Sequence, residues 1–106
     1  MIIKDDDGTV NYVLLNKKQP LGIPTAIISI RLHDRRYFSR FGWNFDKTGH
    51  TYPLLTSTDN YTLCFKASLM KIKGELLSSI ERHKKDDVRS YKAIVKWLQS
   101  IEDVEP

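Results

Sequence analysis

The first half of the chain alternates apolar and polar positions with a period of two, which is the pattern of half-buried β-strands. Apolar residues at Ile2–Lys4 and 9–15 flank Asp6-Asp7-Gly8, and an Asp-Gly pair between two apolar runs predicts a β-hairpin. Residues 25–33 and 36–45 show the clearest alternation, so they predict a second hairpin.

Parity fixes how the strands 25–33 and 36–45 pair, if Asp34-Arg35 is a two-residue turn between them. One face then collects Leu32 opposite Tyr37, Ile30 opposite Ser39, Ile28 opposite Phe41 and Ala26 opposite Trp43. The other face collects His33 opposite Arg36, Arg31 opposite Phe38 and Ser29 opposite Arg40. A slip of one residue would place the basic side chains in the core, so this pairing is strongly specified. Asp-Arg is not a preferred pair for a tight turn, and a longer loop of the same parity is the alternative.

Residues 46–49 predict a turn, and the runs at 51–56 and 61–65 predict two weaker strands. Beyond them the apolar period lengthens to that of a helix. After Ser68, which is a suitable N-cap, apolar residues recur at Leu69, Ile72, Leu76, Leu77 and Ile80. Gly74 lies inside this run and weakens the helix.

A second helix is predicted near the end of the chain, with Asp86 or Asp87 as its N-cap. Its apolar stripe is formed by Val88, Tyr91, Val95 and Leu98. We therefore predict one α+β domain over 1–106, in which 1–65 is mainly β and 66–103 is mainly α. Its architecture is an antiparallel meander of four to six strands, followed by two C-terminal helices packed on one face of the sheet.

Composition places the chain among ordinary globular proteins. Its 106 residues are 41% hydrophobic and 28% charged, which supports a core and argues against disorder of the whole chain. Cys64 is the only cysteine, so no intramolecular disulfide can form, and we expect it to be buried and inert in the strand 61–65. No apolar run suits a signal peptide or a bilayer span. We expect a cytoplasmic protein, or a nuclear one in a eukaryote, that is not secreted and does not bind membranes.

Positive charge gathers on the predicted hairpin 25–45. The net charge of the chain is +4, and the excess lies in 31–50 and 66–96, whereas 1–30 is balanced. On the polar face of the hairpin an aromatic ring stands among cations: the residues are Arg31, His33, Arg36, Phe38 and Arg40, with Lys47 nearby. Guanidinium groups neutralise phosphates, and an aromatic ring stacks on a base. The sequence therefore predicts a non-enzymatic module that binds single-stranded DNA or RNA with little sequence specificity. The structural alternative is a set of solvated surface arginines.

A second function class is a protein-interaction module, such as an inhibitor or an assembly factor. Ile94, Trp97 and Ile101 lie together on the second helix and widen its apolar surface beyond one stripe. If this stripe is exposed, it predicts a protein partner or a homodimer. The basic face of the hairpin could instead dock against an acidic protein.

Catalysis and metal binding have weaker support. His33 and His50, with Arg31 and Arg36, would suit a small basic ribonuclease, in which such side chains move protons and stabilise the transition state. No spacing in the sequence requires this arrangement. The histidines lack metal-ligand spacing, and the acidic run before Gly8 lacks the alternating ligands and later Glu of an EF-hand. We expect no metal and no cofactor.

The order of features from Ala26 to Ile80 resembles the transcriptional-coactivator type of single-stranded DNA-binding fold. The matching features are the hairpin 26–45, the turn 46–49 and the helix 68–80, without a specific motif. That family pairs curved antiparallel strands with a C-terminal helix and dimerises through it. The resemblance therefore implies single-strand binding and a homodimer. The N-terminal hairpin and the second helix depart from the family pattern.

Overall fold

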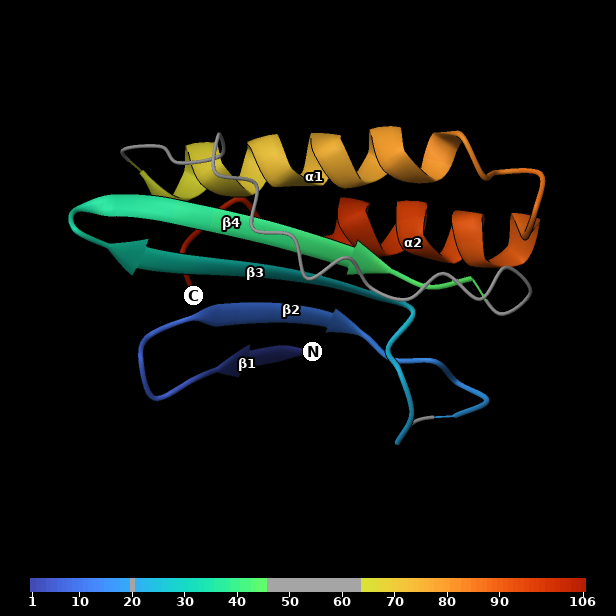
Figure 1. Ribbon diagram of the computed structural model, residues 1–106, viewed down its shortest axis with the longest axis horizontal. Helices are drawn as coiled ribbons and strands as arrows, with labels where there is room; N and C mark the ends of the chain where they lie inside the picture. The colour runs from blue at the N-terminus through green and yellow to red at the C-terminus, as the bar shows by residue number, and fades with distance from the viewer. Residues whose placement is uncertain (20, 46–63) are drawn as a thin grey trace.

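The computed structural model describes residues 1–19, 21–45 and 64–106. Within these ranges the elements are β1 (Ile2–Lys4), β2 (Val10–Leu14), β3 (Ala26–His33), β4 (Arg36–Trp43), α1 (Phe65–Glu81) and α2 (Val88–Ser100). The strands form an antiparallel sheet in the order β1-β2-β3-β4 (Figure 1). The predicted α+β meander followed by two helices is thus confirmed. The predicted turn 46–49 and strand 51–56 lie outside the described residues.

The first hairpin turns at the predicted Asp-Gly pair. The Gly8 N–H donates to the Asp5 carbonyl at 3.0 Å, and the Asp5 N–H donates to the Thr9 carbonyl at 2.9 Å. Gly8 has a φ of 88°, in the left-handed region that glycine adopts without steric cost. Asp7 Oδ1 accepts from the Thr9 N–H at 2.9 Å, which closes the loop from the inside. This arrangement is a tight turn followed by a glycine bulge, a common way to join two antiparallel strands.

The second hairpin has the register that parity predicted. Leu32 pairs with Tyr37, and the pairing continues to Ala26 opposite Trp43. Asp34 and Arg35 have φ values of 49° and 64°, so they form a two-residue turn of type I′ and no longer loop is needed. A left-handed conformation costs a non-glycine residue about 1–2 kcal/mol, and the cross-strand pairs of the long hairpin offset this cost.

The core lies between the two helices and the face of the sheet that carries Ile28 and Ile30. Both of these side chains are buried. Other buried members of the core are Tyr12, Ala26, Trp43, Leu69, Ile72, Leu76, Ile80, Ile94 and Leu98. α1 runs along β4, and α2 runs beside α1 (Figure 1). A hydrogen bond joins the sheet to α1, because Trp43 Nε1 on β4 donates to Ser79 Oγ at 2.8 Å.

α1 begins earlier than the sequence predicted. Its N-cap is Cys64, whose Sγ accepts from the Ala67 N–H at 3.4 Å. Ser68 is buried one turn into the helix, on the same face as Phe65 and Leu69, so the prediction that it caps the helix was wrong. The expectation that Cys64 is buried in a strand was also wrong, because Cys64 is exposed and Phe65 is already helical. The remainder of that predicted strand, 61–63, lies outside the described residues.

α2 begins at one of the two predicted caps, Asp87, which accepts from the Ser90 N–H at 3.1 Å. The stripe of Ile94, Trp97 and Ile101, which would favour a partner if it were exposed, is mostly covered. Ile94 is 0% exposed and Ile101 is 8% exposed, because this side of the helix packs into the core. These two side chains are therefore not available to a partner in this fold. Trp97 is half-buried, so contact of this ring with a partner or a second copy stays a prediction.

Candidate nucleic-acid interface

The turns of both hairpins lie at the same end of the sheet (Figure 1). The strand pairing of Val10 with Ile30 continues one step toward this end, which places Thr9 beside Arg31. Asp5 lies across from Thr9 on one side, and Phe38 lies across from Arg31 on the other. All of these side chains belong to the face of the sheet that points away from the helices, since strand residues alternate between faces.

A hollow of about 370 Å³ opens on this face, and we call it the turn-end hollow. It is lined by residues of all the segments that meet there: Asp5, Asp7, Thr9, Ser29, Arg31, His33, Phe38, Ser39 and Arg40. The structure thus brings Arg31, His33, Phe38 and Arg40 of the predicted set together around one concavity. Arg36 pairs with His33 at its border, and Lys47 lies outside the described residues.

The side chains around the turn-end hollow differ in how far they are open to solvent. Arg31, His33 and Arg36 are exposed, and Phe38 and Arg40 are half-buried. Within the described residues, neither Arg31 nor Arg40 forms a salt bridge. The rings of His33 and Phe38 have centroids 6.3 Å apart at an angle of 59°. The arrangement offers guanidinium groups and an aromatic surface to the same ligand.

The floor of the turn-end hollow is held by buried polar groups. Ser29 Oγ donates to Asn11 Oδ1 at 2.6 Å, and Asn11 Nδ2 donates to the Ile3 carbonyl at 3.1 Å. Ser29 and Asn11 are both buried. Satisfied buried hydrogen bonds of this kind fix the strands that carry them. Arg40, which faces Ser29 across the strands, therefore extends from a rigid base.

Two carboxylates line the turn-end hollow beside the arginines, and sequence reasoning missed them. Asp5 and Asp7 belong to the turn between β1 and β2. Hydrogen bonds from the side chain and backbone of Thr9 hold the pKa of Asp7 below its usual range, and the charge of Arg31 lowers it further. Asp7 therefore stays ionised at neutral pH and lowers the local positive potential.

The signal for this proximity was present in the strand order. In a meander, the first and third turns lie at the same end of the sheet, because each strand reverses direction. If each strand pairs with the next one along the chain, the turn at 5–8 and the turn at Asp34-Arg35 must therefore lie side by side. Counting net charge segment by segment does not reveal that these aspartates lie beside the arginines. Asp5, Asp6 and Asp7 cancel the lysines of their own segment, 1–30, in such a count.

Only some of the residues considered for ribonuclease or metal chemistry lie within the described residues. His33 Nε2 lies 3.4 Å from Asp34 Oδ2 on the exposed turn, and His50 lies outside the described residues. Across 1–19, 21–45 and 64–106, no three His, Cys, Asp or Glu side chains converge as metal ligands. In the same ranges, no helix combines the length and apolar character that crossing a bilayer requires.

No family model, no curated protein and no solved structure significantly matches this chain.

Proposed function

We propose that the protein binds single-stranded nucleic acid in the turn-end hollow and does so without catalysis. The observation that carries the proposal is the half-buried ring of Phe38 directly across from the exposed Arg31. Arg36 and Arg40 flank Phe38 on β4, each two residues away and thus about 7 Å along the strand. A base stacked on the ring would leave its phosphates within reach of these guanidinium groups.

The two carboxylates give the proposed site a preference among bases. Asp5 and Asp7 repel phosphates, so the backbone of the bound strand runs on the side of β3 and β4. Carboxylates accept hydrogen bonds from exocyclic amino groups, such as the N4 amino group of cytosine. Bases with an amino group therefore bind better than uracil or thymine. We expect cytosine, adenine and guanine to be preferred, because each carries an exocyclic amino group.

The salt dependence of binding follows from the number of arginines that reach phosphates. Three contacts, from Arg31, Arg36 and Arg40, give a slope of log K against log salt of about −2 for a single strand. Raising the salt from 50 to 200 mM then weakens binding about 20-fold. A protein surface that binds through apolar contacts would show almost no such dependence.

Fluorescence anisotropy with labelled oligo-C, oligo-A and oligo-U strands and with a duplex, at both salt concentrations, tests the proposal. Phe38→Leu keeps the apolar volume but removes the stacking surface, and we expect about a tenfold loss of affinity. Arg31→Ala should reduce the magnitude of the salt slope by about 0.7. Arg89→Ala is the matched control, since Arg89 is an exposed arginine on α2. Absence of binding at 50 mM salt, or equal loss in Arg89→Ala and Arg31→Ala, refutes the proposal.

Asp5→Asn tests the proposed role of the carboxylates. The substitution removes the repulsion of phosphates, so affinity for oligo-U should rise more than affinity for oligo-C. The preference between the two strands should therefore shrink. An unchanged preference shows that the carboxylates do not face the bases. Gel analysis of the RNA after each titration checks for cleavage, which would point to the ribonuclease alternative.

The second candidate function is binding of an acidic or mixed-charge protein. The turn end carries as many aspartates as arginines, namely Asp5, Asp6, Asp7 and Asp34 against Arg31, Arg35, Arg36 and Arg40. Balanced charge weakens the attraction to a polyanion, whereas interleaved charges of both signs give specificity at protein interfaces. Failure of every nucleic-acid titration at low salt would favour this candidate.

A further inference from the structure

A shallow groove lies between α1 and α2 on the solvent side of the two helices, and we call it the helix groove. Its volume is about 250 Å³. Its walls come from both helices and are mainly apolar: they are Lys73, Gly74, Leu77, Val95, Leu98 and Gln99. An apolar cavity of about 150 Å³ holds a benzene molecule, so the helix groove has room for one large apolar side chain of a partner.

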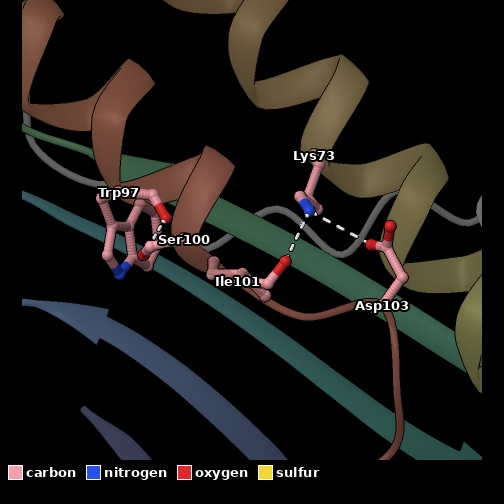
Figure 2. Close-up of polar contacts among 5 residues, drawn as sticks. All are labelled: Lys73, Trp97, Ser100, Ile101 and Asp103. Atoms are coloured by element: carbon pink, nitrogen blue, oxygen red, sulfur yellow. Dashed lines mark hydrogen bonds and ion pairs between the residues drawn. The ribbon is translucent and has the colours of Figure 1, made fainter.

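Hydrogen bonds hold α1 and α2 together at both ends of the helix groove. At one end the Tyr91 hydroxyl donates to Glu81 Oε1. At the other end, Figure 2 shows Lys73 reaching from α1 to the chain after α2, where its Nζ donates to the Ile101 carbonyl at 3.0 Å and to Asp103 Oδ1 at 3.1 Å. The walls of the groove are therefore fixed before a partner arrives, which lowers the cost of ordering on binding.

Gly74 supplies the observation that a partner would explain. Inside a helix, glycine is less favourable than any residue except proline. Gly74 has the ordinary backbone conformation of α1, which needs no glycine. A Cβ atom added at Gly74 would meet no atom within 4 Å among the described residues, so packing inside the chain does not require glycine either. Close approach of a partner's backbone to α1 does require a residue without a side chain.

Exposed apolar side chains continue the surface on both sides of Gly74. Met70 and Leu77 lie about one turn away from Gly74 in either direction and on the same side of α1. They are 53% and 37% exposed. Val95 of α2 stands across the groove. A groove between helices with apolar contacts at this spacing receives the apolar face of an amphipathic helix.

The rim of the helix groove is basic. Lys92 and Lys96 lie within one turn of Val95 on α2, and Lys66 precedes Met70 by one turn on α1. All three lysines are exposed, and none forms a salt bridge within 1–19, 21–45 and 64–106. A second copy that presented the same surface would bring like charges together, whereas an acidic partner would complement them.

We propose that the helix groove binds an acidic amphipathic helix of another protein. One apolar side chain of that helix enters the groove beside Leu77 and Val95, and its backbone lies close to α1 at Gly74. Its carboxylates pair with the three lysines of the rim. This surface is separate from the turn-end hollow, which opens on the face of the sheet away from the helices, and the proposal does not depend on nucleic-acid binding.

Selection of a library of displayed helical peptides on the full chain tests the proposal. We expect the selected peptides to carry apolar residues at one-turn spacing and Asp or Glu on either side of them. An NMR titration with one selected peptide should then give saturable shifts of the amides of Gly74, Leu77 and Val95. A version of the same peptide with lysine in place of every acidic residue should bind about tenfold more weakly.

Matched variants separate the floor of the groove from its charge. Gly74→Leu fills the floor and should weaken binding of the peptide about tenfold. Ala93→Leu should not, because Ala93 is two positions from Val95 and thus on another side of α2. Lys92→Gln with Lys96→Gln should weaken binding about fivefold, and Lys17→Gln with Lys18→Gln, after β2, is the control for charge.

Gly74→Ala tests the argument from glycine on the free chain. Because the added methyl group meets no described atom, this variant should raise Tm by about 4 °C. A lower Tm would show that the fold itself needs glycine, and it would overturn the proposal. Selected peptides without acidic residues, or equal binding to Gly74→Leu and Ala93→Leu, would also overturn it. So would a dimer in sedimentation that Gly74→Leu converts to a monomer, because the groove would then belong to a second copy.

Discussion

Removing one oxygen atom from each of two buried tyrosines should change stability in opposite directions. In Tyr12→Phe the lost hydroxyl is buried and has no partner among the described residues. Leaving such a group unpaired costs about 1–3 kcal/mol, so its removal should raise the free energy of unfolding by about 1–2 kcal/mol. For a domain near this size, each 1 kcal/mol corresponds to about 4–8 °C in Tm.

Tyr91→Phe is the matched variant. The Tyr91 hydroxyl donates to Glu81 Oε1, and this hydrogen bond is the main cause of the raised pKa of Tyr91. Its loss removes a charge-assisted hydrogen bond between α2 and the end of α1, so the free energy of unfolding should fall. The two variants delete the same atom, and only the surroundings of that atom differ.

Urea denaturation followed by circular dichroism measures both variants, because an unchanged m value shows that only stability has changed. Thermal unfolding gives an independent measure through Tm. The reasoning is refuted if Tyr12→Phe is destabilised as much as Tyr91→Phe. That result would mean that the Tyr12 hydroxyl is hydrogen-bonded in solution.

Four further substitutions or conditions test other parts of the structure. Arg35→Gly should raise Tm by relieving a positive φ, with a gain of about 0.5–1 kcal/mol in urea denaturation. Asp87→Ala removes the N-cap bond from the Ser90 N–H and should cost about 1 kcal/mol, measured the same way. Ile94→Ala should lower the free energy of unfolding by about 3 kcal/mol, because the Ile94 side chain is buried in the core. A loss below about 1 kcal/mol would mean that Ile94 is not part of the core and is open to a partner. Since the pKa of Asp7 is lowered in the folded state, its contribution is present above the unfolded pKa and is lost as pH falls through the folded value. Stability measured from pH 5 to pH 2 should fall less in Asp7→Asn, which retains the acceptor for Thr9.

The pairing of β3 with β4 could be read from the sequence, because the side chains of a strand alternate between its faces. Placing Ile28 and Ile30 toward the core forces Arg31 and Phe38 to the other face, and any one-residue slip reverses both. The first hairpin could also be predicted from the sequence, since Gly8 tolerates the left-handed conformation that its turn needs. Local patterns of this kind also limited the cap of α2 to Asp86 or Asp87, and the structure has Asp87.

The start of α1 could not be read in the same way. Ser68 and Cys64 both have side chains that can accept a hydrogen bond from a backbone N–H, and serine is the commoner cap. The choice depended on burial, because Phe65 and Leu69 must share the face that packs on the sheet, and Ser68 lies on that face too. Only the packed structure shows which of the two residues is left outside the core.

The sequence by itself determined the four strands of the described sheet, their faces and the set of basic side chains, because these follow from the period of two residues along a strand. The tertiary structure alone decided what stands next to that set and which helix face is covered. It places Asp5 and Asp7 beside Arg31, buries Ile94 and leaves Tyr12 without a partner among the described residues. Such neighbours come from segments distant in sequence, and local periodicity says which face a residue occupies but not what packs against that face.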